Sequence, residues 1–200
     1  MFDVALRRLV DPALIRVAAW FASARIPANA ITISGAVLGV GAAFFITQSN
    51  FAAALALIVL NRVFDGLDGA IARANGATDF GGYLDTICDY VFYLAIPVAF
   101  ALTAPLNQIP ALLLVSSFTL TAVSFLAFAA IAARQSHDEG AHGPKAFFYS
   151  TGLMEGGETI AFFVLFCLFP AFFPTLAIIF AALCLLTVVH RVVLAMRVFR

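Results

Sequence analysis

The stretch DGLDGAIAR, Asp65 to Arg73, places two aspartates and an arginine within otherwise apolar sequence. Long hydrophobic runs lie on both sides, and two further aspartates, Asp85 and Asp89, follow in similar surroundings. An ionised residue at the centre of a membrane helix costs about 2.5–3.5 kcal/mol on insertion scales. Acids retained at such a cost face a protein interior or a wet cavity, so the stretch indicates a functional site.

The composition around this stretch is that of an integral membrane protein. Of the 200 residues, 64% are hydrophobic and 11% are charged, whereas soluble domains contain roughly 25% charged residues. Apolar stretches of about 20 residues, the length that crosses a bilayer core, recur along the chain. The formal net charge is zero, and we expect no nucleic-acid partner.

Six helical membrane spans are predicted, at about 28–48, 51–74, 80–102, 111–133, 151–169 and 175–194. Upstream of them, charged and apolar residues alternate at helical spacing, which favours an amphipathic helix in the membrane interface. An ordinary surface helix is the alternative. The predicted fold is all-α and integral to the membrane: an interfacial helix, residues 1–25, followed by a six-span domain, residues 26–200.

Basic residues are distributed unequally among the predicted loops. They precede the first span, end the second, lie between the fourth and fifth, and close the chain. The three loops on the other side contain no lysine or arginine. The positive-inside rule therefore predicts that both termini are cytoplasmic. We expect the acids to lie near the cytoplasmic face, in a bacterial inner membrane.

The four aspartates are predicted to converge on one small volume. Asp65 and Asp68 are three residues apart, and so share a helix face. Asp85 and Asp89 are four residues apart and share a face too. The turn NGATD, Asn75 to Asp79, makes the two helices antiparallel, and a rise of about 1.5 Å per residue puts both pairs at one depth.

Carboxylates packed this closely need cations to remain ionised. Ligand sets made only of oxygen favour hard divalent ions such as Mg²⁺, Mn²⁺ or Ca²⁺, and two such ions would neutralise the four acids. Glycines beside the acids permit close helix packing or leave room for a flat ligand: Gly66, Gly69, Gly81 and Gly82. With Arg73 at the mouth, the pattern suits a metal-bound diphosphate and phosphoryl chemistry.

These residues resemble a known signature, that of the CDP-alcohol phosphatidyltransferases: Asp65-x-x-Asp68-Gly69-x-x-Ala72-Arg73, then Gly81-x-x-x-Asp85-x-x-x-Asp89. Six spans behind an amphipathic helix match that family too. The segment PANAIT, Pro27 to Thr32, is similar to the family's proline–asparagine–threonine pattern, although Asn29 comes one residue later than usual.

The resemblance implies an enzyme of phospholipid biosynthesis that transfers the phosphatidyl group of CDP-diacylglycerol to a small alcohol and releases CMP. It implies two Mg²⁺ or Mn²⁺ ions held by Asp65, Asp68, Asp85 and Asp89. Asp89 would also be the catalytic general base on the acceptor hydroxyl. It implies a homodimer as well. The implied CDP-lipid contacts are Asn29, Thr32, Asp65, Gly69, Ala72 and Arg73.

The acceptor alcohol is left open by the sequence. Candidate acceptor contacts are Arg134, Lys145, Glu155, Glu158 and Arg191, but structural ion pairs or interface anchors account for them equally well. A phosphate-binding set of basic residues would favour glycerol 3-phosphate, which we prefer, or inositol phosphate. Inositol, serine and choline are the neutral or zwitterionic alternatives.

Two other functions are considered. A divalent-cation transporter would need acids spread over the full depth of the membrane, whereas these acids cluster near one face. A non-catalytic relative would not need an intact signature. The three cysteines lie in apolar stretches without metal-ligand spacing, and we interpret them as small buried hydrophobic residues: Cys88, Cys167 and Cys184.

Overall fold

The computed structural model describes Phe21 and residues 26–138 and 156–199, which form helices joined by short turns. No strand occurs among these described residues, so the predicted all-α class is confirmed. The predicted interfacial helix, residues 1–25, lies outside the described residues except for Phe21. The helices are α2 (Ala28–Thr47), α3 (Phe51–Asn75), α4 (Asp79–Ala101), α5 (Pro105–Asp138), α7 (Gly156–Leu168), the 3-10 turn η1 (Pro170–Phe172) and α8 (Phe173–Val198).

Four segments of the described chain are long and apolar enough to cross a membrane: α2, α4, Pro105–Arg134 of α5, and Pro170–Val198. Helix α7 is apolar but has only 13 residues in the described part of the chain. Helix α3 has 25 residues, but four of them are charged: Arg62, Asp65, Asp68 and Arg73. The chain is an integral membrane protein, and the count of six spans stays a prediction.

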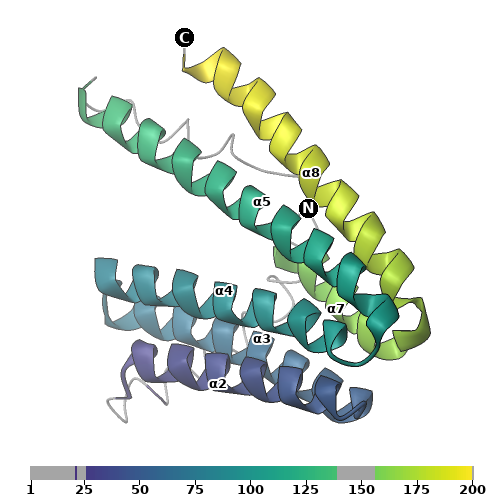
Figure 1. The fold of residues 1–200 in the computed structure, drawn as a ribbon. Coiled ribbons are helices and arrows are strands. Elements are labelled where there is room, and N and C mark those ends of the chain that lie inside the picture. The colour runs from purple at the N-terminus through teal and green to yellow at the C-terminus, as the bar shows by residue number, and fades with distance from the viewer. Residues whose placement is uncertain (1–20, 22–25, 139–155, 200) are drawn as a thin grey trace.

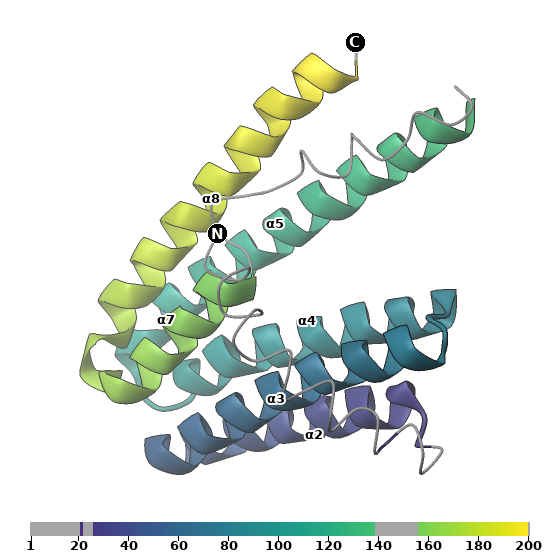
Figure 2. The same ribbon diagram turned by 180° about the vertical axis from the view of Figure 1, so that it is seen from behind.

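The helices form two layers (Figure 1). In one layer α2 packs against both α3 and α4, and in the other α5 packs against α8. Helix α4 contacts α5, and α7 contacts α3 and α8, so these helices join the layers. The layers meet where α4 turns into α5 and diverge toward the turn between α3 and α4, as the reverse view also shows (Figure 2).

Aromatic side chains fill the region where the layers meet. Six phenylalanines from α4, α7 and α8 are almost completely buried: Phe92, Phe100, Phe163, Phe166, Phe173 and Phe180. The rings of Phe100 and Phe173 stack with centroids 4.5 Å apart. Such pairs contribute about 0.5–1.5 kcal/mol beyond the area that they bury. This aromatic core fixes the layers at one end and leaves the other end open.

The turn between α3 and α4 follows the predicted NGATD pattern. Helix α3 ends at Asn75, and Gly76 adopts a φ of 96°, a conformation that favours glycine. Thr78 caps α4, because its side-chain oxygen accepts a hydrogen bond from the backbone N–H of Gly81 at 3.0 Å. The turn brings the acid-bearing parts of α3 and α4 to the same end of the fold.

Helix α5 begins earlier than the predicted fourth span, which starts at about residue 111. Pro105 occupies its first turn, where the missing N–H has no helical partner to lose. The side chain of Asn107 donates hydrogen bonds to the Phe100 carbonyl at 3.1 Å and to the Thr103 hydroxyl at 2.8 Å. The predicted boundary was wrong because Pro105 and the Asn107 contacts allow the helix to begin there.

Candidate active site

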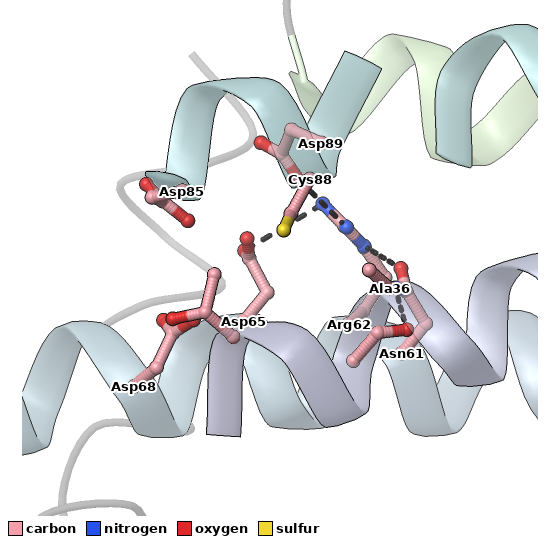
Figure 3. A pocket seen from close by; sticks show the side chains of 10 residues that line it. Ala36, Asn61, Arg62, Asp65, Asp68, Asp85, Cys88 and Asp89 are labelled. Carbon is pink, nitrogen blue, oxygen red and sulfur yellow. Dashed lines mark hydrogen bonds and ion pairs between the residues drawn. The ribbon is translucent and has the colours of Figure 1, made fainter. Parts of the chain in front are cut away.

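The acids of α3 and α4 face each other across a small space beside α2 (Figure 3). One carboxylate oxygen from each of Asp65, Asp85 and Asp89 lies within 4.8 Å of the other two. Oxygens bound to a Mg²⁺ or Ca²⁺ ion at 2.0–2.6 Å are separated by up to about 4–5 Å. The three carboxylates are therefore close enough together to be candidate ligands of one hard divalent cation.

The fourth acid, Asp68, lies beside this group rather than in it. Its side chain is buried and lines the same small cavity, together with Thr32 and Gly35 of α2. We call the space bounded by the four aspartates the acid pocket. Its volume is about 10 Å³, which is close to the least that holds one water molecule.

A second cavity, of about 660 Å³, adjoins the acid pocket at the end of the fold where α3 turns into α4. We call it the mouth cavity. It shares Thr32, Asp68 and Asp85 with the acid pocket. Its volume lies within the usual range for small-molecule sites, about 300–1,000 Å³. It is also lined by small or polar residues of α2, α3 and α4: Asn29, Gly69, Ala72, Gly81 and Gly82.

The glycines at the mouth cavity differ in their surroundings. A Cβ on Gly82 would meet no atom within 4 Å, so this glycine faces open space. A Cβ on Gly81 would lie 3.1 Å from the Thr78 hydroxyl and 3.3 Å from the Asn29 amide oxygen. The absence of a side chain at Gly81 therefore lets the Asn29 side chain of α2 come close to α4. Both predicted roles of the glycines, close helix packing and room for a ligand, therefore occur. Gly66 is half-buried and lines neither cavity.

Arg73 lies in the exposed last turn of α3. Its side chain runs back along the helix, because a Cβ on Gly69 would lie 3.2 Å from one guanidinium nitrogen. The guanidinium is therefore close to Gly69 at the rim of the mouth cavity. Of the predicted CDP-lipid contacts, Asn29, Thr32, Gly69 and Ala72 line the mouth cavity, whereas Asp65 lines only the acid pocket.

Arg62 is the cation within the acid pocket, and we did not predict it as a site residue. Its guanidinium lies 3.0 Å from Asp89 Oδ1 and 3.5 Å from Asp65 Oδ2. The spacing of three residues between Arg62 and Asp65 was the signal in the sequence, since it puts both on one helix face. Four carboxylates against one guanidinium leave the pocket strongly negative, as a cation-binding site requires.

Cys88 also lines the acid pocket and is half-buried, so its interpretation as a buried hydrophobic residue was wrong. It lies three residues after Asp85 and therefore shares its helix face. Cys167 and Cys184 are buried, as predicted.

Of the predicted acceptor contacts, Arg134, Glu158 and Arg191 lie in α5, α7 and α8 and do not line either cavity. Lys145 and Glu155 lie outside the described residues. Arg134 is exposed near the end of α5, and Glu158 is half-buried in the first turn of α7. Arg191 is buried and connects α8 to α5: it donates hydrogen bonds to the carbonyl of Thr121 at 2.8 Å and to the hydroxyl of Ser124 at 3.2 Å.

A family model for CDP-alcohol phosphatidyltransferase matches residues 25–199. The chain belongs to this family. The expectation from the aspartate signature is thereby confirmed, and the protein is a CDP-alcohol phosphatidyltransferase family enzyme. Inner membrane protein YnjF of Escherichia coli strain K12 is 43% identical over 193 residues, an alignment that covers 96% of this chain and 94% of that protein.

Solved structures share the fold of this family member. Phosphatidylinositol phosphate synthase of Mycobacterium tuberculosis with CDP-DAG bound has a TM-score of 0.63 and 22% identity, covering 90% of this chain and 91% of that one. The same synthase in complex with manganese and citrate has a TM-score of 0.62 and 23% identity, with coverage of 90% and 87%.

Proposed function

We propose that this enzyme transfers the phosphatidyl group of CDP-diacylglycerol to the hydroxyl of a small alcohol and releases CMP, as a step of phospholipid biosynthesis. The observation that carries the proposal is the junction of the two cavities at Thr32, Asp68 and Asp85. A diphosphate held at the acid pocket can extend its nucleotide into the mouth cavity. The structures of the M. tuberculosis synthase with CDP-DAG and with manganese support this assignment.

The acid pocket fits divalent ions by the chemistry of its donors, because its four carboxylates are hard oxygen ligands. We propose that Asp65, Asp68, Asp85 and Asp89 hold two Mg²⁺ or Mn²⁺ ions. When bound, the ions polarise the diphosphate and neutralise charge that develops on its oxygens. The oxygens of Asp65, Asp85 and Asp89 already lie within 4.8 Å of one another, and Asp68 adds a carboxylate at the side of the mouth cavity.

The remaining groups bind and orient the two substrates. Asn29, Thr32, Gly69 and Ala72 line the mouth cavity and would contact the nucleotide, with Arg73 at its rim. We propose that Asp89 accepts the proton of the acceptor hydroxyl. The hydroxyl oxygen then bonds to the phosphatidyl phosphorus as the bond between that phosphorus and the oxygen of CMP breaks. An alcohol is a weak nucleophile near neutral pH, so a positioned carboxylate base contributes about 10²–10⁴-fold.

For the acceptor we propose glycerol 3-phosphate. Inositol phosphate, inositol, serine and choline are the alternatives within the same chemistry. Arg134 lies near the end of α5 and Glu158 lies in the first turn of α7, and Lys145 and Glu155 belong to the sequence between these two helices. We retain Arg134, Lys145, Glu155, Glu158 and Arg191 as proposed acceptor contacts.

We also propose the arrangement in the membrane. An interfacial helix, residues 1–25, precedes a six-span domain, residues 26–200, with both termini and the active site at the cytoplasmic face of a bacterial inner membrane. The relative YnjF, an E. coli inner membrane protein, supports that location. We further propose a homodimer. Chemical crosslinking in native membranes that yields only monomer would contradict the dimer.

The proposed reaction is tested by CMP release from purified protein in lipid nanodiscs. The protein is incubated with CDP-diacylglycerol, Mg²⁺ or Mn²⁺, and each acceptor in turn, and the lipid product is identified by mass spectrometry. We expect release that depends on metal and on one acceptor, with glycerol 3-phosphate the most active. Asp89→Asn should lower the rate by about 10²–10⁴-fold.

Asp79→Asn is the matched control, because Asp79 is an exposed acid in the first turn of the same helix and lines neither cavity. It should retain wild-type turnover. Absence of acceptor-dependent CMP release with every acceptor and both metals would contradict the proposed function. Divalent-cation flux into protein-containing vesicles, without CMP release, would favour the transporter instead.

A further inference from the structure

Arg62 makes polar contacts with residues of both α3 and α4 around the acid pocket. Nη2 donates to Asp89 Oδ1 at 3.0 Å, and Nη1 lies 3.5 Å from Asp65 Oδ2. Nη1 also donates to the Tyr93 hydroxyl at 3.3 Å. The guanidinium therefore bridges an acid of α3 and an acid of α4 (Figure 3).

The position of this guanidinium is itself fixed from several sides. Its Nε donates to Asn61 Oδ1 at 2.8 Å, and Asn61 Nδ2 donates to the Gly35 carbonyl of α2 at 2.8 Å. Its central carbon lies 4.9 Å from the centroid of the Phe92 ring, a cation–π distance. Asn61 is buried, and the Arg62 side chain is 19% exposed. The side chain is thus held by contacts with α3 and α4, and α2 supports it through Asn61.

The contacts leave the two oxygens of Asp89 in different environments. Oδ1 accepts the charged hydrogen bond from Arg62 at 3.0 Å, a distance typical of a good hydrogen bond. Within the described part of the chain, the hydrogen-bond partner of Oδ2 is the Tyr93 hydroxyl at 3.5 Å, which is at the outer limit for an interaction of this kind. Arg62 thus orients the carboxylate by one oxygen and leaves the other available.

We propose that Arg62 is a positioning residue: it anchors Asp89 through Oδ1, so that Oδ2 faces the acceptor hydroxyl, and it opposes divalent-ion binding by its charge. The first half rests on the proposed function. The second half does not, because it concerns only the electrostatics of the acid pocket. Arg62 touches no reacting atom in this scheme, and it acts through Asp89 and Asp65.

The proposal predicts opposite changes in turnover and in metal affinity. Removing the guanidinium takes a positive charge away from two metal-binding carboxylates, so a divalent cation should bind more tightly. The same change releases Asp89 from its anchor, so turnover should fall. Substitution of a residue that only stabilises the fold would lower both turnover and metal affinity. The opposite changes expected here therefore distinguish a positioning role from structural support.

The test compares Arg62→Gln and Arg62→Lys with wild type in the full-length purified protein. Free Mn²⁺ is measured by electron paramagnetic resonance in titrations without CDP-lipid, and CMP release gives kcat and KM. For Arg62→Gln we expect an Mn²⁺ Kd at least threefold lower, a kcat about 100-fold lower, and a KM for CDP-diacylglycerol within threefold of wild type. Arg62→Lys keeps the charge but loses the fork geometry, so it should recover at least a tenth of wild-type kcat and a Kd near wild type.

Arg197→Gln is the control, because Arg197 is an exposed arginine in the last turn of α8 and lines neither cavity. It should match wild type in every measurement. Wild-type kcat in Arg62→Gln would overturn the proposal, and so would weaker Mn²⁺ binding in that variant. If Arg62→Gln does not fold, a kcat for Arg62→Lys below a hundredth of wild type, with wild-type Mn²⁺ affinity, would overturn it. If wild type itself releases no CMP, the proposed function fails, and the Mn²⁺ titrations alone decide the electrostatic half.

Discussion

At the scale of single residues, the side chains of the candidate active site differ in their surroundings. Asp65, Asp85 and Asp89 meet closely enough to share a cation, whereas Asp68 lies where the acid pocket opens into the mouth cavity. The glycines also differ in their surroundings. Gly82 borders open space, and Gly81 permits contact with Asn29 and Thr78.

The open space at Gly82 leads to a prediction about the nucleotide. Gly82→Phe should fill part of the mouth cavity and raise the KM for CDP-diacylglycerol by at least tenfold, because the added ring would occupy the volume proposed for the nucleotide. Mn²⁺ affinity measured without the lipid should stay within twofold of wild type. The matched control is Tyr83→Ala, since Tyr83 is the next residue, is exposed and lines no described cavity. An unchanged KM in Gly82→Phe would place the nucleotide elsewhere.

At the scale of helices, α2 is the element that sets the spacing of the acids. Both α3 and α4 pack against it, and its small residues determine how closely they approach. A Cβ on Gly39 would lie 2.7 Å from the Phe92 ring of α4, which is closer than packed atoms come. A Cβ on Gly41 would instead lie 3.3 Å from the terminal methyl of Leu57, which can move aside.

These two glycines form a matched pair for a stability test. Gly39→Ala should lower the free energy of unfolding by about 1–3 kcal/mol, the usual cost of overpacking, because the Phe92 ring is fully buried and cannot yield. Gly41→Ala should be neutral or stabilising, since alanine is favoured over glycine in a helix by about 1 kcal/mol. Thermal unfolding in detergent measures both. Equal stability of the two variants would show that α2 does not control the approach of α4.

At the scale of the whole molecule, the two layers meet at an aromatic core and diverge toward the turn between α3 and α4 (Figure 1). The acid pocket and the mouth cavity lie in the α2–α4 layer near that turn. A lipid substrate has its tails in the bilayer and its polar part at the surface, so a site near one end of the spans would reach the diphosphate of the proposed substrate. The distribution of basic residues predicts that this end is cytoplasmic.

Labelling with a membrane-impermeant thiol reagent tests this orientation. Ser49→Cys lies in the turn between α2 and α3, and Ala77→Cys lies in the turn between α3 and α4; both positions are exposed. In intact spheroplasts we expect labelling of Ser49→Cys only, and in inverted vesicles labelling of Ala77→Cys only. The unsubstituted protein, with Cys88, Cys167 and Cys184, supplies the background. Labelling of both positions from one side would contradict a membrane-crossing α3.

The all-helical class, the membrane setting, the family and the convergence of the acids could be predicted from the amino-acid sequence. Each of these follows from local rules: hydrophobic length, helical spacing and turn chemistry. Asp65 and Asp85 lie at a predictable distance from the turn because Asn75, Gly76 and Thr78 specify where one helix ends and the next begins. The spacing of charges along a helix is a property of the chain alone.

The contacts between helices could not be predicted from the sequence and became visible in the three-dimensional fold. The anchoring of Asp89 by Arg62 joins residues 27 positions apart, and the support from Asn61 to Gly35 joins residues 26 apart. The mouth cavity is bounded by three helices at once. Contacts between helices depend on how the helices are rotated and how closely they pack, and those are set by the shapes of side chains such as Phe92 and the absence of one at Gly39.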